Sequence, residues 1–276
     1  MANSVTFRRL LAGTTALSVP LILVGVYTAI AGFGLTCEAR WPLCDGAVFG
    51  LFPANWGSFV EWFHRLIAMV FGFAILGTIA SALRQSIDRR ILAALGLATL
   101  LTPLQIVFGA LTVTTYEQVI LAAHFSTAIG IFSLLATATI LTGRLADTAP
   151  DLGSTAATTG GLLLVAVPIT PRFLFAPSAE VHVLYYAFAL LGLGGLLAGA
   201  VLTTGRARNV AITGAAVLAF GMVLSRLTVT AIAPSVLVGT TIVATLAGAA
   251  AAIAIYAWRD RGIEASVDSS YSSRPN

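Results

Sequence analysis

Residues 59–83 read FVEWFHRLIAMVFGFAILGTIASAL, a stretch long and apolar enough to cross a bilayer as one helix, which takes about 20 residues. It nevertheless places Glu61, His64 and Arg65 in its first two turns. Ionisable side chains inside a membrane helix are costly, so their presence indicates a functional site. Because Glu61 and His64 are three residues apart, a carboxylate and an imidazole share one face of this helix.

The whole chain has the composition of an integral membrane protein. Of its 276 residues, 58% are hydrophobic and only 9% are charged, whereas soluble domains carry about 25% charged residues. The net charge is +4, and all 15 basic residues are arginines scattered along the chain. This scatter does not form the basic stripe typical of nucleic-acid binding. The expected partner is therefore the lipid bilayer, with no nucleic acid.

Apolar segments separated by helix-breaking residues predict an all-α polytopic protein with about eight transmembrane helices. Each segment is near the ~20 residues that a span needs. The first is too long for a signal peptide and is expected to be retained. The fifth is the weakest, because it is short and is interrupted by Pro168, Pro171 and Arg172. The predicted spans are 10–32, 59–83, 91–114, 119–142, 158–175, 180–203, 210–231 and 235–258.

The arginines predict the orientation of these spans. With eight crossings, both termini lie on one side of the membrane. Placing that side in the cytoplasm leaves only Arg40 and Arg172 in outer loops and puts the other loop and terminal arginines inside. This asymmetry is what the positive-inside rule requires. We expect a multi-pass protein of the cell membrane with both termini cytoplasmic.

The predicted organisation is two four-helix halves joined by a polar segment. LTVT occurs at residues 111–114 and again at 227–230, which indicates either an internal duplication or chance similarity between apolar helices. The predicted parts are an N-terminal bundle with the substrate site (1–145), a cytoplasmic linker (146–158), a C-terminal bundle (159–259) and a disordered cytoplasmic tail (260–276).

The three histidines of the chain fall at one predicted depth. His64, His124 and His182 lie near the outer ends of spans that run in the same direction, within about 10 Å of the outer surface. A single buried histidine often makes only a hydrogen bond between helices. The common level instead favours ligation of haem iron, with His64 and His124 as a candidate pair across a bundle. Zinc is disfavoured because it takes about four close ligands.

Cys37 and Cys44 are the only cysteines. Both fall in the predicted outer loop between the first two spans, on the oxidising side of the membrane, so a disulfide is expected. It would serve as a loop staple or as a redox-active pair.

Two arginines lie near the predicted depth of the histidines. Arg65 points about 100° away from the neighbouring histidine around the helix. It either snorkels to the interface or pairs with a haem propionate. Arg226 lies near the outer end of the seventh predicted span, where its partner would be Glu180 or a bound anion.

Four motifs, in this order and spacing, resemble the haem A synthase family of eight-helix membrane proteins: GLTCEARWPLCDG, EWFHRL, LQIVFGALTVTT and AAHFSTA. The similarity is strong over residues 32–131 and thin in the second half. It implies two pseudo-symmetric four-helix bundles and conversion of the C8 methyl group of haem O to a formyl group, which yields haem A for terminal oxidases. The partners it implies are haem O, haem A, a haem O synthase and a terminal oxidase.

The resemblance also implies roles for individual residues. The substrate haem would lie between His64 and His124, with Glu61 catalytic and Cys37 and Cys44 a functional pair. Oxidising the methyl group builds positive charge on its carbon, which a carboxylate stabilises, or the carboxylate takes a proton from an attacking water. Glu61 has a second interpretation, as a partner that orients a histidine or a nearby arginine.

The second half departs from the family pattern. Members commonly hold a haem b cofactor in the C-terminal bundle between two histidines; His182 matches the first, but no histidine follows it. A haem there would be five-coordinate or use another ligand, or the site has been lost and His182 is structural. The sequence favours a single-ligand or absent cofactor haem. Glu180 precedes His182 by two positions rather than three and so lies off its face.

Two other functions remain open. One is a b-type cytochrome that relays electrons between quinol and an outer partner. The lone His182 in the second half argues against a relay across the membrane, as does Glu61 on the ligand face. The other is a non-catalytic haem carrier or oxidase assembly factor.

Overall fold

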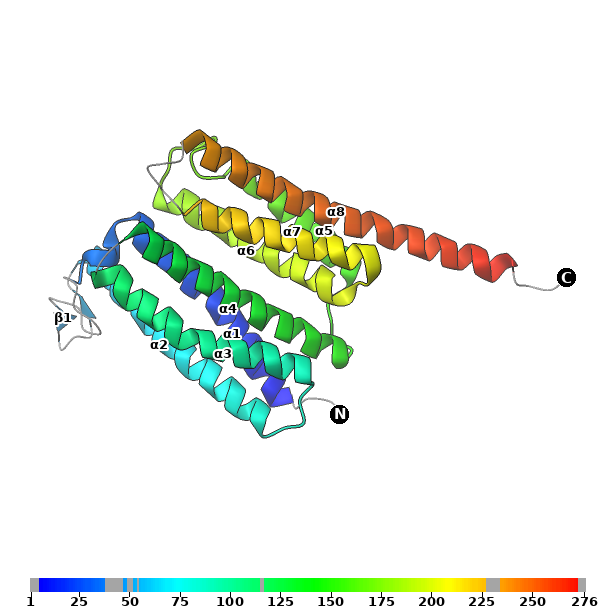
Figure 1. The fold of residues 1–276 in the computed structure, drawn as a ribbon, viewed down its shortest axis with the longest axis horizontal. Coiled ribbons are helices and arrows are strands. Elements are labelled where there is room, and N and C mark those ends of the chain that lie inside the picture. Colours follow the sequence, from blue (N-terminus) through cyan, green and yellow to red (C-terminus); the bar gives the residue numbers. More distant parts are fainter. Residues whose placement is uncertain are drawn as a thin grey trace.

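The computed structural model confirms an all-helical polytopic membrane protein. It describes residues 5–37, 47–48, 52–53, 55–114, 117–226 and 234–272, with 47–48, 52–53 and 259–272 described by their backbone alone. Within these residues, eight α-helices form two groups that lie side by side with their axes roughly aligned (Figure 1).

The first group contains helices α1 to α4. A 3₁₀ turn, η1 (Phe33–Leu35), follows the first helix, and a two-residue antiparallel hairpin of β1 (Ala47–Val48) and β2 (Phe52–Pro53) precedes the second. Asn55 caps the second helix by accepting a hydrogen bond from the Ser58 N–H at 2.9 Å. The four helices are α1 (Val5–Ile30), α2 (Trp56–Leu83), α3 (Arg89–Thr114) and α4 (Gln118–Leu145).

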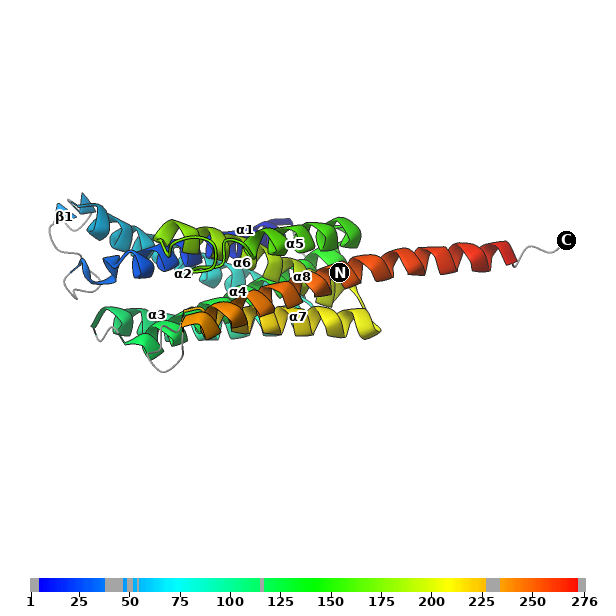
Figure 2. The same cartoon turned by 90° about the horizontal axis from the view of Figure 1, so that it is seen from above.

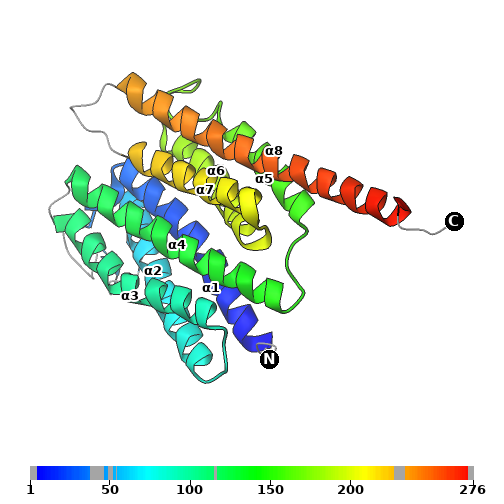
Figure 3. The same ribbon diagram turned by 45° about the vertical axis from the view of Figure 1, so that its right-hand side comes forward.

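The second group contains α5 (Leu152–Ala166), α6 (Ala179–Leu202), α7 (Gly205–Leu224) and α8 (Pro234–Ser272). The two groups meet where α1 and α4 pack against α6, and α4 also contacts α7 (Figure 3). The start of α1 and the end of α8 lie at one end of the molecule, here called the terminal end. The opposite end, where β1 lies, is called the hairpin end (Figure 1).

Seven of the described helices are long and apolar enough to cross a membrane, and α5, with 15 residues, is a shorter apolar helix. The predicted bounds of the fifth span, 158–175, are therefore wrong, as is the linker at 146–158. Helix α5 begins at Leu152 because the Asp151 carboxylate accepts a hydrogen bond from the Ser154 N–H at 2.8 Å, a helix N-cap. It ends at Ala166, shortly before Pro168 and Pro171.

The C-terminal tail also differs from its prediction. Disorder was expected from residue 260, but α8 continues to Ser272 and projects beyond the other helices at the terminal end (Figures 1 and 2). The sequence RDRGIEA at 259–265 contains no proline and is rich in residues with good helix propensity, which allows the helix to continue. The seventh helix likewise ends at Leu224 rather than at 231.

Two large buried apolar clusters lie among the described residues, together with a small one of Ala156, Ala211 and Ile255. The larger runs through the interface between the groups and includes Val26 of α1, Phe125 of α4 and Tyr186 of α6. The other large cluster lies within the first group, in the half toward the terminal end. Leu11 of α1 and Leu135 of α4 are among its fully buried members. The half of the first group toward the hairpin end is where the polar side chains of the candidate site lie.

Candidate functional site

His64 and His124 both point into the first group of helices. The His64 ring packs against Gly25 of α1, where an added Cβ would lie 2.8 Å from its Cε1 atom. The His124 ring packs against Gly109 of α3, where an added Cβ would lie 3.2 Å from Cε1. Helices α2 and α4, which make no direct contact with each other among the described residues, thus each direct an imidazole into the first group.

Several buried polar atoms around these rings have no hydrogen-bond partner among the described residues. They are the Nδ1 atoms of His64 and His124 and the Oε1 atom of Gln105. The Gln105 amide nitrogen lies 3.3 Å from His124 Nε2. Leaving such a group unsatisfied costs about 1–3 kcal/mol, so a native cluster of them indicates a missing ligand. Two imidazoles with unused nitrogens are a donor set that suits haem iron.

Glu61 is buried, at 3% exposure, and its carboxylate is held from three directions. Its Oε2 atom accepts hydrogen bonds from the Cys37 N–H at 2.9 Å and from the Thr36 hydroxyl at 3.1 Å. Its Oε1 atom forms an ion pair with the Arg65 guanidinium, one turn along α2. Glu61 thereby fastens the start of α2 to the segment that follows η1, and Arg65 pairs within the protein instead of reaching to the interface.

The predicted cysteine pair is only partly visible. Cys37 is fully buried and is not a free thiol. Cys44 lies outside the described residues. The pairing of Cys37 with Cys44, and whether it is structural or redox-active, therefore stays a prediction.

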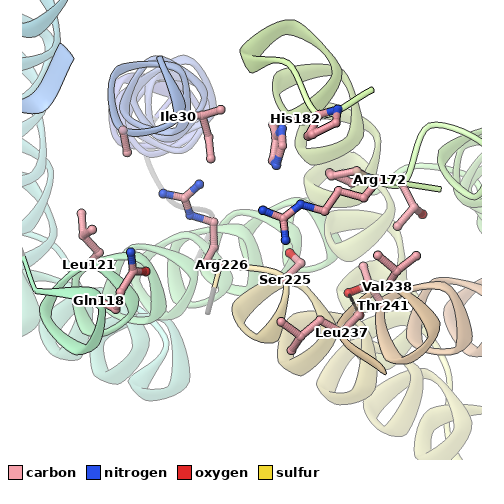
Figure 4. Close-up of a pocket in the computed structure, with 14 residues that line it drawn as sticks. Ile30, Gln118, Leu121, Arg172, His182, Ser225, Arg226, Leu237, Val238 and Thr241 are labelled. Atoms are coloured by element: carbon pink, nitrogen blue, oxygen red, sulfur yellow. Dashed lines mark hydrogen bonds between the residues drawn. The ribbon is translucent and has the colours of Figure 1, made fainter. Parts of the chain in front are cut away.

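His182 and Arg226 lie elsewhere, in a cavity of about 320 Å³ at the hairpin end, between the two groups (Figure 4). His182 Nδ1 lies 2.7 Å from the Ser178 carbonyl oxygen, to which it donates, so Nε2 of the neutral ring is an acceptor. The Arg226 guanidinium lies 5.9 Å from the centre of the Phe125 ring of α4, a cation–π contact.

Glu180 is exposed and forms no ion pair with Arg226 among the described residues. The expected pairing of Arg226 with Glu180 is therefore wrong. The structure therefore separates the predicted site residues into two places: His64, His124, Glu61 and Arg65 in the first group, and His182 with Arg226 in the cavity.

Sequence reasoning missed four residues of these two places. Gln105 is an amide in the middle of an apolar span, and that position was a usable signal. Gly25 and Gly109 make room for the imidazoles, but nothing in the sequence pairs each glycine with its ring. Arg172 lines the cavity, whereas the sequence indicated only an interruption of the fifth span and a place in an outer loop.

Residues 54–174 match the model of the family described as cytochrome oxidase assembly protein, the haem A synthase family. The matched stretch includes Glu61, His64 and His124 and ends before His182. The resemblance of the N-terminal half to this family is thereby confirmed over that stretch.

The chain is also similar to curated proteins named protoheme IX farnesyltransferase. It is 36% identical to the one from Haloarcula marismortui over 132 residues, which are 48% of this chain and 28% of the relative. It is 32% identical to the one from Haloquadratum walsbyi over 136 residues, 48% of this chain and 27% of the relative. The chain thus spans little more than a quarter of the length of these relatives. No solved structure matches the chain.

Proposed function

We propose that the chain is a haem-modifying oxidoreductase of the haem A synthase type, which converts the C8 methyl group of haem O to a formyl group. The observation that carries this proposal is the pair of inward-pointing imidazoles, His64 and His124, whose buried Nδ1 atoms have no partner among the described residues. The family match over residues 54–174 supports it, because the matched stretch contains both histidines.

His64 of α2 and His124 of α4 are proposed to bind the iron of the substrate haem from opposite faces. Because Gly25 and Gly109 have no Cβ, the adjacent surfaces of α1 and α3 leave room for the two rings. Gln105 would fix the orientation of the His124 ring by accepting a hydrogen bond from the ring N–H through its amide oxygen, which has no other partner among the described residues, as residues next to metal ligands commonly do. These contacts would hold the macrocycle in one orientation, which is a precondition for oxidising a single methyl group.

Glu61 is the proposed catalytic carboxylate. It lies one turn before His64 on the same helix and is buried, so its charge acts in a water-poor site. In the structure Arg65 holds Glu61 Oε1. We assign Arg65 to a haem propionate when substrate is bound, which frees Oε1 to stabilise positive charge at the reacting carbon or to take a proton from water.

The cavity between the two groups does not fit a haem held between two histidines. His182 is the only imidazole that the sequence provides there, and the guanidiniums of Arg172 and Arg226 point into the same space (Figure 4). No step of the proposed reaction therefore runs through a second haem. His182 and Arg226 are proposed to bind a smaller ligand.

The proposed setting is the cell membrane, with both termini and the terminal end in the cytoplasm. The hairpin end, and with it the substrate site, would then lie near the outer face. The proposed partners are haem O and haem A, with a haem O synthase as the source and a terminal oxidase as the recipient. The name shared by the relatives, protoheme IX farnesyltransferase, supports a place for this chain in haem modification.

A second candidate is a non-catalytic haem carrier for oxidase assembly. The observation that favours it is the engagement of Glu61 by Arg65, Thr36 and the Cys37 N–H, which suits a carboxylate that fastens a loop. On this reading His64 and His124 hold haem without altering it.

One experiment separates the two candidates. The full chain is expressed in cells that supply haem O, and the haem extracted from the purified protein is analysed by mass. The oxidoreductase predicts haem A or its alcohol intermediate, in amounts that depend on the chain. Haem that is bound but unmodified would favour the carrier, and absence of bound haem would contradict both candidates.

A further inference from the structure

The cavity at the hairpin end is an anion site on charge grounds. Two guanidiniums, from Arg172 and Arg226, point into it, and none of the described residues that line it is acidic (Figure 4). Like charges that share a small, partly buried space repel one another unless an anion lies between them. The Arg226 Nε atom is buried and has no hydrogen-bond partner among the described residues. A buried guanidinium N–H without an acceptor is costly, so we expect an acceptor from outside the chain to bind there.

The backbone conformation of Arg172 is also consistent with an anion site. Arg172 has a φ of 69°, in the left-handed region that non-glycine residues rarely adopt. Strain of this kind persists where the surrounding structure imposes it, and it is common at ligand sites. Here it accompanies a guanidinium that reaches over the cavity toward Ser225, below His182 (Figure 4).

Helix ends add to the positive potential. Gln118 is the first residue of α4, and His182 and Leu237 lie in the first turns of α6 and α8, so three helix N-termini border the cavity. These three ends carry partial positive charge, whereas only two helix C-termini, of α1 and α7, border the cavity with partial negative charge. The Thr170, Ser225 and Thr241 hydroxyls donate to carbonyl oxygens within their own segments, so the guanidiniums and the Gln118 amide are the side-chain donors for a ligand.

The geometry points to a phosphate-class oxyanion as the ligand of this cavity, held between Arg172 and Arg226. Guanidiniums pair with phosphate oxygens through two parallel hydrogen bonds, which makes a pair of arginines a fitting clamp. A volume of about 320 Å³ accommodates a phosphate group with a small attachment and lies near the lower limit for organic ligands. A hydroxyl on the ligand would donate to His182 Nε2.

Two sources could supply this phosphate. Phe173, Leu174 and Phe175 follow Arg172 and are exposed apolar side chains, which places the arginine beside a surface suited to lipid and favours a phospholipid headgroup. Free inorganic phosphate is the other source. The inference does not rest on the proposed function, because it concerns binding in the cavity between the groups and not haem oxidation in the first group.

The test measures the thermal stability of the purified, delipidated full chain in neutral detergent. Inorganic phosphate is added in one arm, with sodium chloride of equal ionic strength as its reference. Phosphatidylglycerol is added in the other, with phosphatidylcholine as its reference. A ligand that binds the folded state raises Tm, and at a given concentration a tighter ligand raises it more. We expect Tm to rise with one of the two probes above its reference, and the probe that acts identifies the source.

Arg172→Gln and Arg226→Gln are each expected to weaken that effect about tenfold or more in apparent affinity, since each removes charge-assisted hydrogen bonds. Arg172 is exposed, so its variant is expected to fold even if the Arg226 variant does not. Arg206→Gln on α7 is the matched control, because it removes an exposed positive charge outside the cavity and should bind like the wild type.

Three outcomes would overturn the inference. One is a Tm that neither probe raises above its reference. Another is an equal effect in the Arg172, Arg226 and Arg206 variants. The third is a haem that remains bound when His64 and His124 are both replaced by alanine and is lost when His182 is also replaced, because that haem would occupy the second group.

Discussion

Glu61 and His64 share one face of α2, yet their surroundings differ. The carboxylate is saturated by Arg65, Thr36 and the Cys37 N–H, whereas the imidazole keeps a buried nitrogen without a partner. The spacing of three residues predicted the common face. The spacing of four between Glu61 and Arg65 would also have predicted their ion pair, a standard helix contact. Of these two residues, His64 is therefore the one whose environment indicates a bound ligand.

Glu61→Gln tests the proposed chemistry. The amide keeps the size of the side chain but loses the charge, so we expect haem to remain bound while haem A yield falls about 100-fold or more, the usual scale of a lost acid or base. Stability should fall by about 1–3 kcal/mol, because Arg65 loses its charged partner. Mass analysis of extracted haem is the measurement, and Glu180→Gln, at an exposed glutamate, is the control. Normal haem A yield from Glu61→Gln would remove Glu61 from the mechanism.

Gly25→Ala tests whether the packing of His64 matters for haem. The added Cβ would lie 2.8 Å from Cε1 of the ring, too close for the ring to keep its place. We expect haem affinity to fall about 10- to 100-fold, as when a residue that positions a metal ligand is changed. Haem titration followed by absorbance measures this.

Gly13→Ala is the matched control on the same helix, because a Cβ there meets nothing within 4 Å. Gly109→Ala should have a milder effect than Gly25→Ala, since its Cβ would lie 3.2 Å from His124 Cε1. Equal haem affinity in the Gly25 and Gly13 variants would show that the His64 ring position is not critical.

At the scale of helices, hydropathy located all eight elements but misplaced the fifth, which was predicted at 158–175 and runs from Leu152 to Ala166. Residues 152–160, LGSTAATTG, are small and polar and resemble a linker, but Asp151 caps them and apolar neighbours bury one face. Only packing against α6 and α8 distinguishes this helix from a loop. The same limit explains why Gly25, Gly109 and Arg172 were not predicted, since their roles depend on which helices are neighbours.

The turn between α2 and α3 offers a test of helix capping. Asp88 accepts a hydrogen bond from the Arg90 N–H at 2.8 Å and two more from the Arg90 guanidinium, each at 3.1 Å. Asp88→Ala should lower the free energy of unfolding by about 1 kcal/mol or less, because the site is exposed and screened. Asp88→Asn keeps a capping oxygen and should lose less. Thermal unfolding in detergent measures both, and equal stability of all three proteins would show that the cap does not contribute.

The same cap predicts a pH dependence. Hydrogen bonds from the Arg90 side chain, and then from its backbone N–H, hold the pKa of Asp88 below its ordinary value of 3.8. A depressed pKa in the folded state means that the contribution is complete above the ordinary value and is lost as pH falls through the lowered one. The stability difference between wild type and Asp88→Ala should therefore be constant near neutral pH and shrink below about pH 3.8. A difference that grows in acid would contradict this sign.

At the scale of the molecule, the arrangement joins two groups of helices through one buried cluster and places the start of α1 and the end of α8 on one side (Figure 1). The arginine distribution predicts that this side is cytoplasmic. A reporter fused after Asn276 tests it: a fluorescent protein that folds in the cytoplasm should be active, and a phosphatase that needs export should not. The converse result would invert the orientation and place the histidines near the inner face.

The central claim is that His64 and His124 bind one haem iron between them, and the spectrum of haem bound to the full chain tests it most directly. The account predicts a low-spin, six-coordinate haem in the wild type and in His182→Ala. It predicts a change to high spin, or loss of haem, in His64→Ala and in His124→Ala. An unchanged low-spin spectrum in both of these variants would contradict it.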